Sequence, residues 1–532
     1  MIKLKDIGSV KMSEKKWLSH ISPEIIIENK NRVCAYLVAL EGWRRGLTLT
    51  WYSKKVKSNK IHAPGRYFSL SNERKIHYFY KSKGDLTNIN AQRITGRKHL
   101  TKEVLSEAGV SVPKGKVFKK EAPDLEVISY ANNLGYPLVL KPTNGFQGIG
   151  VFANLKNEQE LKGALEHLRN DMGYKEVIIE QFIDGVEYRI FVIGEKVIGA
   201  IEKIPPMIVG DGTSTVKQLI RQKNKEKKKN PHLFKKPIKI DYEVENCVKE
   251  AGYNLDSVLK PGKELLVRKK NSLSSGGDPV DATDLISEST IETSIKALNA
   301  IPNLSLGGLD VMVDKNTGEA YIIEINAIPM IGSHLFPEIG IARDVPSAII
   351  DYYFPETKDQ PRVNDNVYFD LNNALQPLHS KIASEITMQS IPAWDNFSQM
   401  KFIIKGKVQG VGFRRWARRK ALENNLFGYA KNKQDGSVEV IVSGEYSDID
   451  KFKQLCLTGP IKASVTEVID NNWNGPVKVG FEIKESKKRT KPKKKIDTNI
   501  VEKSKNNTNN KSKKAPSLKS KIKRRIKRLI KK

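Results

Sequence analysis

Polar side chains stand inside two apolar, strand-like stretches, and this arrangement constrains the fold more than any other feature of the chain. Asp310 lies within residues 308–313, and Glu324 and Asn326 lie within residues 320–326. Residues two apart on a strand point to the same face, so Glu324 and Asn326 share one face and Asp310 can lie opposite them. A buried carboxylate is costly unless its charge is compensated, and oxygen ligands on adjacent strands suit a Mg²⁺ ion that also binds phosphates. We therefore predict a metal site here rather than a hairpin with polar residues facing solvent.

The chain has 532 residues and a net charge of +32, but this charge is unevenly spread. From Lys487 to Lys532 there are 21 Lys and Arg residues against two acidic residues, which accounts for +19 of the total. The rest of the chain is only moderately basic, and its hydrophobic content of 39% suffices for packed cores. The whole-chain charge therefore says little about the chemistry of the folded domains.

Three cysteines, Cys34, Cys247 and Cys456, are far apart and show neither metal-binding nor redox spacing. This pattern is typical of a protein of the reducing cytoplasm without a disulfide framework. No apolar run reaches the roughly 18 residues of a transmembrane helix, and residues 1–6 lack the apolar core of a signal peptide. We expect a cytoplasmic protein, with peripheral attachment to a membrane as an alternative.

Shifts in composition divide the chain into five regions. They are a small N-terminal α/β region at 1–92, a region with nucleotide-binding motifs at 93–356, a linker at 357–397, a compact second unit at 398–485 and a basic disordered tail at 486–532. The tail cannot bury enough surface to fold alone, although residues 518–532 could form a basic amphipathic helix.

A glycine-rich loop follows an apolar strand that ends in Lys141-Pro142. Gly145 and Gly148 allow the backbone of this loop to approach a phosphate closely, and Lys141 adds a point charge. Further on, a strand at residues 177–183 leads to Glu187, which could accept hydrogen bonds from ribose hydroxyls. Taken singly, a glycine-rich loop is often an ordinary turn and Glu187 an exposed strand residue.

Taken in order, these motifs resemble the ATP-grasp superfamily over roughly residues 93–340. Within it, the chain is similar to cyanophycin synthetase and to the C-terminal module of bifunctional glutathione synthetase. Three stretches carry the likeness: Val209-Gly-Asp-Gly-Thr-Ser-Thr-Val-Lys-Gln-Leu-Ile220, Leu266-Val-Arg-Lys-Lys-Asn-Ser-Leu-Ser-Ser-Gly-Gly-Asp278 and Glu324-Ile-Asn-Ala-Ile-Pro-Met330.

The resemblance implies an α+β fold in which two α+β subdomains grip ATP, preceded by the N-terminal α/β region. It implies ATP-dependent joining of an amino-acid or peptide carboxylate to an amine through an acyl-phosphate, with two Mg²⁺ ions, or Mn²⁺ in their place. For ATP, the resemblance implies phosphate binding by Lys98, Lys141, Gly145 and Gly148, adenine contact by Glu180, Gln181 and Ile183, and ribose contact by Glu187. It implies metal binding by Asp310, Glu324 and Asn326. It further implies that Arg268 acts in catalysis at the transferring phosphoryl group and that Arg189, Gly276 and Gly277 bind the acceptor carboxylate.

Two departures from the pattern stand out. The family's usual Asn-Leu-Ser-Thr-Gly-Gly is one residue longer here, at residues 271–277, and Asp278 occupies a position that is usually Ala or Val. No Mur-ligase-like domain follows, so polymerisation of aspartate and arginine is not implied.

Residues 398–485 show the order strand, helix, strand, strand, helix, strand, which is typical of a ferredoxin-like βαββαβ fold. This region resembles acylphosphatase over nearly its whole length, on the loop Gly406–Arg414 and the pair Lys431-Asn432. The glycines let the loop wrap a phosphate at a helix N-terminus, and Arg414 offers a planar fork to two phosphate oxygens. Asn432 would orient the attacking water, and no metal is required. A phosphate-binding or purely structural unit without turnover is the alternative.

The favoured hypothesis is therefore a bifunctional enzyme, an ATP-grasp ligase fused to an acylphosphatase. A second hypothesis is an ATP-binding scaffold or sensor that its basic tail tethers to a membrane or nucleic acid, and a third is a ligase that adds amino acids to a protein or polymer. For residues 487–532, an anionic membrane surface, nucleic acid and a purely solvated tail all stay open. Assembly of the protein into a homo-oligomer also stays open.

Overall fold

The computed structural model describes residues 17–28, 32–53, 55–56, 61–62, 64–143, 149–269, 272–358, 365–388, 390–391 and 396–485. The chain divides into two units, Met1–Glu485 and Ser486–Lys532. The basic tail and its predicted helix at 518–532 lie outside the described residues, as do Gly145 and Gly148.

An antiparallel sheet of order β19-β1-β4-β5-β6 and the buried helix α2 build the N-terminal region. Its elements before residue 92 are α1 (Pro23–Glu28), α2 (Val33–Arg44), β1 (Thr48–Tyr52), β2 (Lys55–Val56), β3 (Ile61–His62), β4 (Tyr67–Ser71), β5 (Ile76–Tyr80), β6 (Lys83–Gly84) and the start of α3 (Ile89–Thr95). α2 is buried along almost its whole length because apolar residues occupy nearly every position. This region is therefore a helix-and-strand layer with its core between α2 and the sheet.

Part of the predicted linker, 357–397, belongs to this same core. It contains the short elements β18 (Val367–Tyr368), α12 (Leu371–Ala374), α13 (Gln376–His379) and β19 (Glu385–Met388). β19 pairs with β1, and the buried Phe369 packs edge-on against Tyr36 and Trp43 of α2. Each of these elements is too short to show a hydrophobic period, which explains why the sequence pattern indicated a connector.

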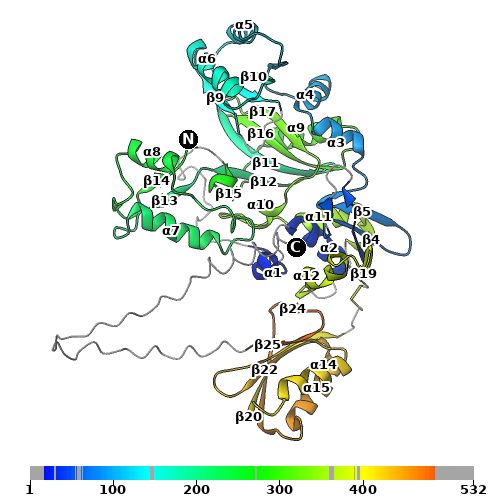
Figure 1. The fold of residues 1–532 in the computed structure, drawn as a ribbon. Coiled ribbons are helices and arrows are strands. Elements are labelled where there is room, and N and C mark those ends of the chain that lie inside the picture. The colour runs from blue at the N-terminus through cyan, green and yellow to red at the C-terminus, as the bar shows by residue number, and fades with distance from the viewer. Residues whose placement is uncertain are drawn as a thin grey trace, which may run out of the picture. The chain divides into compact units, whose positions relative to one another are not determined.

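A four-stranded antiparallel sheet of order β7-β10-β8-β9 forms the first half of the nucleotide-binding region. Its strands are β7 (Gly115–Phe118), β10 (Val177–Gln181), β8 (Leu138–Pro142) and β9 (Phe152–Leu155). The helices α5 (Asp124–Leu134) and α6 (Glu158–Glu166), the latter continued by a π-turn at His167–Asp171, cover one face of the sheet (Figure 1). The opposite face is thereby left for the polar side chains described below.

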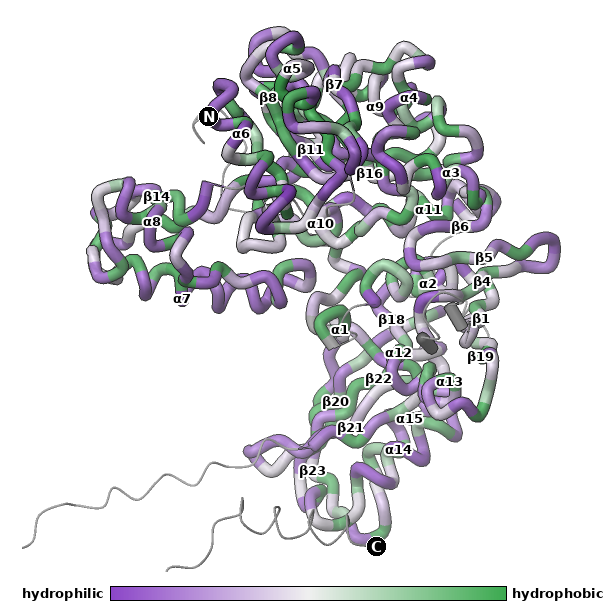
Figure 2. The backbone as a smooth tube through the Cα atoms, turned by 45° about the horizontal axis from the view of Figure 1, so that its top comes forward, coloured by the Kyte–Doolittle hydropathy of each residue, from purple (hydrophilic) through white to green (hydrophobic). Residues whose placement is uncertain are grey.

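The second half is a five-stranded antiparallel sheet of order β15-β12-β11-β16-β17. Its strands are β15 (Asp278–Asp281), β12 (Lys196–Ile204), β11 (Gly185–Ile193), β16 (Leu306–Asp314) and β17 (Ala320–Asn326), and α3, α4 (Lys98–Glu107) and α9 (Glu288–Ala300) pack against it. The apolar start of β8 and the apolar second half of β11 are coloured green in Figure 2. β17 has the bounds that the sequence pattern predicts, and β16 extends the other predicted strand at both ends.

A small lobe between β12 and β15 has a core of its own. It consists of β13 (Met207–Val209), α7 (Val216–Lys227), α8 (Tyr242–Glu250) and β14 (Glu264–Leu266), followed by a 3₁₀ turn at Leu273–Ser275. After β17 come α10 (Gly332–Leu335), α11 (Val345–Tyr353) and a 3₁₀ turn at Pro355–Thr357. α11 packs with α2, so this last part of the region shares the N-terminal core.

The C-terminal domain, residues 398–485, is a sheet of order β23-β20-β22-β21-β25 that shares one core with two helices. Its elements are β20 (Phe397–Lys407), α14 (Phe413–Glu423), β21 (Phe427–Asn432), β22 (Val438–Glu445), α15 (Tyr446–Thr458), β23 (Ser464–Asn472), β24 (Val477–Lys478) and β25 (Phe481–Lys484). The predicted βαββαβ order is confirmed, with β24 as a short addition that pairs with β18. The α+β class is confirmed for the chain as a whole.

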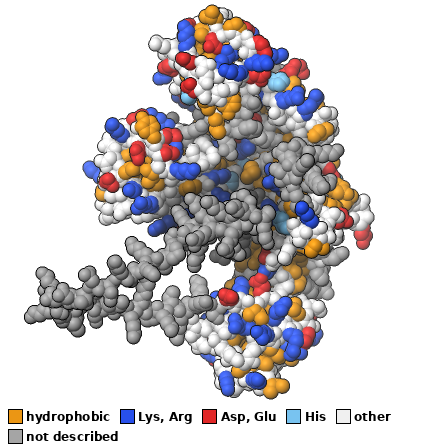
Figure 3. All heavy atoms as spheres, in the orientation of Figure 1, with side chains coloured by type: hydrophobic (Ala, Val, Ile, Leu, Met, Phe, Trp, Pro, Cys, Tyr) orange, Lys and Arg blue, Asp and Glu red, His pale blue; other side chains and the backbone are white. Residues whose placement is uncertain are grey.

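Within the part of the chain that the structure describes, no helix is both long enough and apolar enough to span a lipid bilayer. On the face shown in Figure 3, Lys and Arg side chains are interspersed with acidic ones. The concentrated positive charge of the sequence lies in residues 487–532.

Candidate active sites

Glu180 lies between two lysines on the face of β10 opposite to α5 and α6. Lys141 Nζ lies 2.5 Å from Glu180 Oε2, and Lys102 Nζ lies 2.6 Å from Oε1. Glu180 is only 3% exposed. Burial alone would raise the pKa of the Glu180 carboxyl, but Lys141 and Lys102 hold it below its ordinary value. Gly115 on β7 permits this packing, because a Cβ there would lie 2.8 Å from Glu180 Cγ.

Lys98, at the start of α4, connects this face with the second sheet. Burial and the charge of Lys141 lower the pKa of Lys98, and the carboxylates of Glu324, Glu180 and Asp310 oppose that shift. One lysine therefore lies within electrostatic reach of carboxylates from both sheets. A cavity of about 440 Å³ opens beside it, lined by residues that include Lys98, Lys102, Lys114, Gly115 and Ile178.

The sequence motifs alone assign no role to Lys102. It follows Lys98 by four residues on α4, so both lie on one face of the helix. That spacing is the signal that could have found it. Its partner Glu180 comes from a strand far along the chain, which only the tertiary structure reveals.

The other predicted nucleotide contacts on this sheet lie at the end of β10. The backbone N–H of Gln181 donates to Lys114 O at 2.8 Å, and Ile183 is buried. The backbone N–H of Gln181 is thus occupied within the sheet, because β10 lies between β7 and β8, and the predicted adenine contact stays a prediction.

Asp310 on β16 lies at the centre of a polar face of the five-stranded sheet, which is called the second face below. It pairs directly with Arg189 of β11 on one side and with Glu324 of β17 on the other. Arg189 Nη1 lies 3.0 Å from Asp310 Oδ2, and Lys203 Nζ lies 3.1 Å from Oδ1 and 2.5 Å from a Glu187 oxygen. Burial alone would raise the pKa of the Asp310 carboxyl, but Arg189 and Lys203 lower it.

Asn326 faces the same arginine from the end of β17. In the amide orientation that its neighbours require, its Oδ1 accepts from Arg189 Nη1 at 2.9 Å and from Nη2 at 3.3 Å. Arg189 therefore links two of the three predicted metal ligands.

The donor set of the second face fits Mg²⁺. Two carboxylates and an amide oxygen, from Asp310, Glu324 and Asn326, are hard oxygen ligands on neighbouring strands. The described residues contain no group of three or more His, Cys, Asp and Glu side chains placed as metal ligands, so an ion here would need phosphate oxygens or water as further ligands. Asp310 is held ionised, as a metal ligand must be.

Arg268 does not join these residues in the structure. Arg268 lies instead at one end of the lobe that contains β13 and β14. There it forms ion pairs with Asp241 and Glu243 and donates to Lys239 O at 3.1 Å. The buried position of Arg268 is thus fixed by its own lobe. Its predicted role at the phosphoryl group would require these acids to release it.

The double glycine is packed against the segment that follows α7. Gly276 has φ +104°, and a Cβ there would lie 2.7 Å from Ile238. A Cβ at Gly277 would lie 2.7 Å from Ile204 O. Only glycine can therefore occupy this turn without displacing its neighbours.

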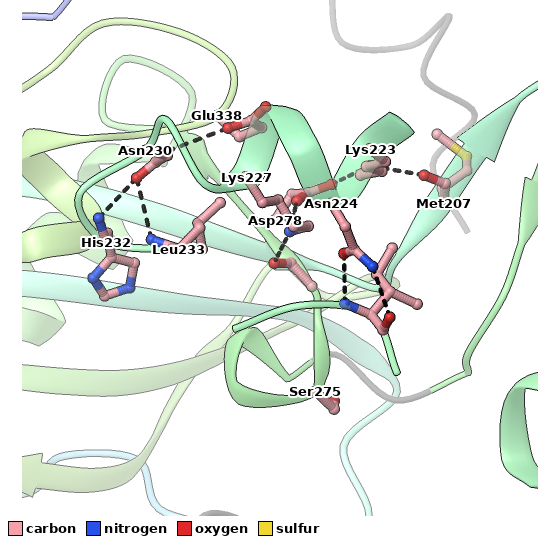
Figure 4. A network of polar contacts seen from close by, with 12 residues as sticks. Met207, Lys223, Asn224, Lys227, Asn230, His232, Leu233, Ser275, Asp278 and Glu338 are labelled. Atoms are coloured by element: carbon pink, nitrogen blue, oxygen red, sulfur yellow. Dashed lines mark hydrogen bonds and ion pairs between the residues drawn. The ribbon is translucent and has the colours of Figure 1, made fainter. Parts of the chain in front are cut away.

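One face of α7 holds this turn in place (Figure 4). Lys227 Nζ donates to Gly277 O at 3.0 Å and pairs with the buried Asp278, while Lys223 Nζ lies 2.5 Å from the other Asp278 oxygen. Asn224 exchanges two hydrogen bonds with the backbone of Ile238. The unusual acid at position 278 is thus the counter-ion of two lysines of this lobe.

The C-terminal domain, residues 398–485, contains a loop of free backbone N–H donors between β20 and α14. The structure gives no acceptor among the described residues to the N–H groups of residues 409–414. Gly410 and Gly412 adopt φ of +76° and +82°, and Gln409 Nε2 pins the loop by donating to Lys433 O and Ser437 O, each at 2.8 Å. Such a loop at a helix N-terminus is suited to an anion.

Arg414 and Asn432 lie on the two elements beside this loop. Arg414 donates to Lys484 O at 3.3 Å in β25. The Asn432 Oδ1 atom is buried and has no hydrogen-bond partner among the described residues. A buried polar atom without a partner is costly, so this oxygen is well suited to hold a water molecule.

Two protein families match this chain. Residues 95–207 match the RimK-like ATP-grasp domain, and residues 400–483 match acylphosphatase. The chain carries an ATP-grasp domain of this kind and a C-terminal acylphosphatase domain, which confirms the predicted fusion.

Known relatives resemble the chain over part of their length. It is 31% identical over 280 residues to cyanophycin synthetase of Geminocystis herdmanii, covering 51% of this chain and 31% of the relative. It is 31% identical over 320 residues to the glutathione biosynthesis bifunctional protein GshAB of Clostridium perfringens, covering 58% and 40%. The acylphosphatase structure from Coxiella burnetii is 32% identical over 17% of this chain and 94% of that one, with a TM-score of 0.16. The chain thus spans about a third of the length of the ligase relatives that it matches.

Proposed function

We propose that this protein is a bifunctional enzyme of acyl-phosphate chemistry. Its ATP-grasp domain joins the carboxylate of an amino acid or peptide to an amine, and its acylphosphatase domain hydrolyses acyl-phosphates. The observation that carries the proposal is a pair of buried ionic clusters on the two sheets, Glu180 with Lys141 and Lys102 on one sheet and Asp310 with Arg189 and Lys203 on the other.

The chain's own side chains have separable roles in the ligase reaction. A substrate carboxylate oxygen attacks the γ-phosphorus of ATP and ADP leaves; the amine then attacks the acyl carbon, loses a proton, and phosphate departs with the bonding electrons. Lys98 and Lys141 would hold the phosphates and Glu187 the ribose. Arg189 would neutralise charge beside Asp310, since it already contacts that carboxylate and Asn326.

Asp310, Glu324 and Asn326 would hold two Mg²⁺ ions, or Mn²⁺, which offset the charge of the phosphates. Arg268 would approach the transferring phosphoryl group after leaving Asp241 and Glu243.

In the second reaction, water attacks the phosphorus of an acyl-phosphate and the carboxylate leaves. The free N–H groups of the loop at 409–414 and the Arg414 guanidinium would bind the phosphoryl oxygens. The unpartnered Asn432 Oδ1 would accept a hydrogen bond from the attacking water.

A screen of amino-acid and dipeptide pairs tests the ligase. The Arg414→Ala protein, in which acyl-phosphate hydrolysis is expected to be lost, is supplied with ATP and Mg²⁺, and ADP release and product masses are measured. We expect ADP release over many turnovers, together with a condensed product, only when a carboxylate and an amine are both present. Binding of ATP without ADP formation in every mixture would instead support the scaffold or sensor hypothesis.

A further inference from the structure

The solvent face of α7 carries a row of basic side chains that none of the roles above uses. Residues 216–239 contain ten Lys and Arg residues against a single acid, Glu226. Four exposed cations follow one another at intervals of four, four and three residues, and they are called the α7 basic row below: Lys217, Arg221, Lys225 and Lys228. Lys228 caps the helix with helical backbone angles, so the four side chains lie within about 80° of one another around the helix axis.

The opposite face of α7 is buried. Val216, Leu219 and Ile220 pack into the core of the small lobe, and Lys227 pairs with the buried Asp278. In Figure 1, α7 lies at the outer edge of this lobe. The lobe therefore holds the helix from one side, and the α7 basic row faces solvent.

The acids nearest to the α7 basic row are engaged with other cations. Glu226 pairs with Lys229, and Asp278 pairs with Lys223 and Lys227 on the inner face of the helix. Among the residues that the structure describes, no member of the row takes part in an ion pair with any of these acids. The positive charge of the row is thus left for a partner outside the described chain.

Helix stability does not explain the row. Like charges four residues apart, such as Lys217 and Arg221 or Arg221 and Lys225, destabilise a helix. A cation in the first turn, such as Lys217, also opposes the helix dipole. The start of α7 is stabilised instead by the capping box of Thr215 and Gln218. A bound polyanion would offset the repulsion within the row.

The spacing of the row fits an extended acidic polypeptide. Four residues of an α-helix rise about 6 Å, and alternate residues of an extended chain lie about 6.6 Å apart on the same side. Carboxylates at alternate positions of an extended segment can therefore meet Lys217, Arg221 and Lys225 in turn. The row is about 16 Å long, which about five extended residues cover.

The side chains that would recognise a nucleic acid are missing from this face. The sequence of α7, Val216–Lys227, contains no aromatic residue on which a base could stack. The amides beside the row are also occupied, because Gln218 belongs to the capping box and Gln222 donates to Ser214 Oγ at 3.2 Å. The row thus offers charge without contacts to bases, which favours an acidic polypeptide.

We propose that the α7 basic row is a docking surface for an acidic segment of a partner protein. Exposed ion pairs are individually weak and are screened by salt, so four of them give a reversible contact that depends on ionic strength. The partner binds on the side of α7 that faces away from Asp278. The contacts of the inner face therefore stay intact, and docking does not depend on the proposed ligase reaction.

Photo-cross-linking of the full-length protein tests this surface. The probe is a peptide of alternating Glu and Ser with a central benzophenone side chain. It is compared with the same peptide carrying Gln in place of Glu and with an oligothymidylate of equal charge that carries a benzophenone. Mass-spectrometric mapping of the labelled residues separates α7 from residues 487–532, whose charge attracts any polyanion. We expect the acidic peptide to label residues 216–228 at low ionic strength and to lose this labelling in high salt.

Replacement of all four cations of the row by Gln should raise the peptide concentration for half-maximal labelling of residues 216–228 about tenfold to a hundredfold. Gln has nearly the helix propensity of Lys and Arg, so the melting temperature and the affinity for an ATP analogue should equal those of wild type. The matched control replaces four exposed lysines on other elements by Gln and should be labelled like wild type: Lys119, Lys156, Lys196 and Lys381.

Three results would overturn the docking surface. They are no labelling of residues 216–228 in wild type, equal labelling by the Gln peptide, and equal labelling of the variant that lacks the row. Labelling of α7 by the oligothymidylate at the strength of the acidic peptide would overturn the assignment of a protein partner.

Discussion

Buried carboxylates in the ATP-grasp domain each face two cationic side chains. Glu180 meets Lys141 and Lys102, and Asp310 meets Arg189 and Lys203. In both cases burial opposes ionisation and the cations reverse that effect, so the pKa of each carboxyl lies below its ordinary value. The predicted nucleotide site is therefore preorganised in its charged form.

Lys102→Met should weaken ATP binding by about tenfold, because Glu180 then draws Lys141 away from the phosphates.

The pH dependence of ATP binding follows from the lowered pKa of Glu180. Its ion pairs are present above its ordinary pKa and are lost as the pH falls through the folded-state value, so removal of one lysine moves that loss to higher pH. Calorimetric titration with a non-hydrolysable ATP analogue over the acid range measures both effects. Lys120→Met, at an exposed lysine, is the control; identical curves for the two variants would refute the role of Lys102.

Asn432→Ala should lower kcat for benzoyl phosphate hydrolysis by about a hundredfold or more and leave KM nearly unchanged. The reason is that Oδ1 would act on the attacking water, whereas the loop at 409–414 binds the phosphoryl group. Steady-state phosphate release measures the effect. Asn471→Ala, at an exposed asparagine of β23, should retain full activity. An increase in KM alone would assign Asn432 to binding.

At the scale of elements, α7 links the small lobe to the edge of the second sheet. Its polar face bears Lys223, Asn224 and Lys227, which reach Asp278 of β15 and the backbone oxygens of Gly277 and Ile238. A single helix face thus sets the distance between the Gly276–Gly277 turn and the sheet.

Asp278→Ala should destabilise the ATP-grasp domain by about 3–5 kcal/mol, the usual cost of a buried charge that loses its partner. The uncompensated charge is that of Lys227, which is 1% exposed. The double variant Lys227→Met with Asp278→Ala should recover part of this loss, because no buried charge then remains unpaired in that position. Scanning calorimetry of the three proteins decides the matter. A single variant as stable as wild type would show that Asp278 is not a structural counter-ion.

For the whole molecule, the activities that we propose for the two domains concern the same bond type, and the question is whether one domain consumes what the other makes. We expect the acylphosphatase domain to discharge an acyl-phosphate that forms when no amine arrives. Phosphate release with ATP and a carboxylate, and without an amine, should then be faster in wild type than in Arg414→Ala. Adding the wild-type acylphosphatase domain as a separate chain to the Arg414→Ala protein, in the same measurement, would show whether the discharge requires the two domains to be fused. Equal release by wild type and variant would exclude the coupling.

The periodic elements of this chain could be predicted from sequence, and the long-range pairs could not. The strands at 320–326 and 427–432 appear as β17 and β21 with unchanged bounds, because alternating apolar residues are a local signal. The elements at 365–388 are shorter than one clear period and acquire their place by packing against α2 and β1. Local patterning therefore accounts for the large sheets and not for the pieces that complete the N-terminal core.

The sequence alone indicated the two domain types, because the order of several motifs along each region resembles the ATP-grasp and acylphosphatase families. Only the tertiary structure decided which charges meet. Lys102 joins Glu180, and Asp278 joins Lys223 and Lys227 instead of the α7 basic row. The physical reason is that the energy of a buried charge depends on its neighbours in space, which chain order does not specify.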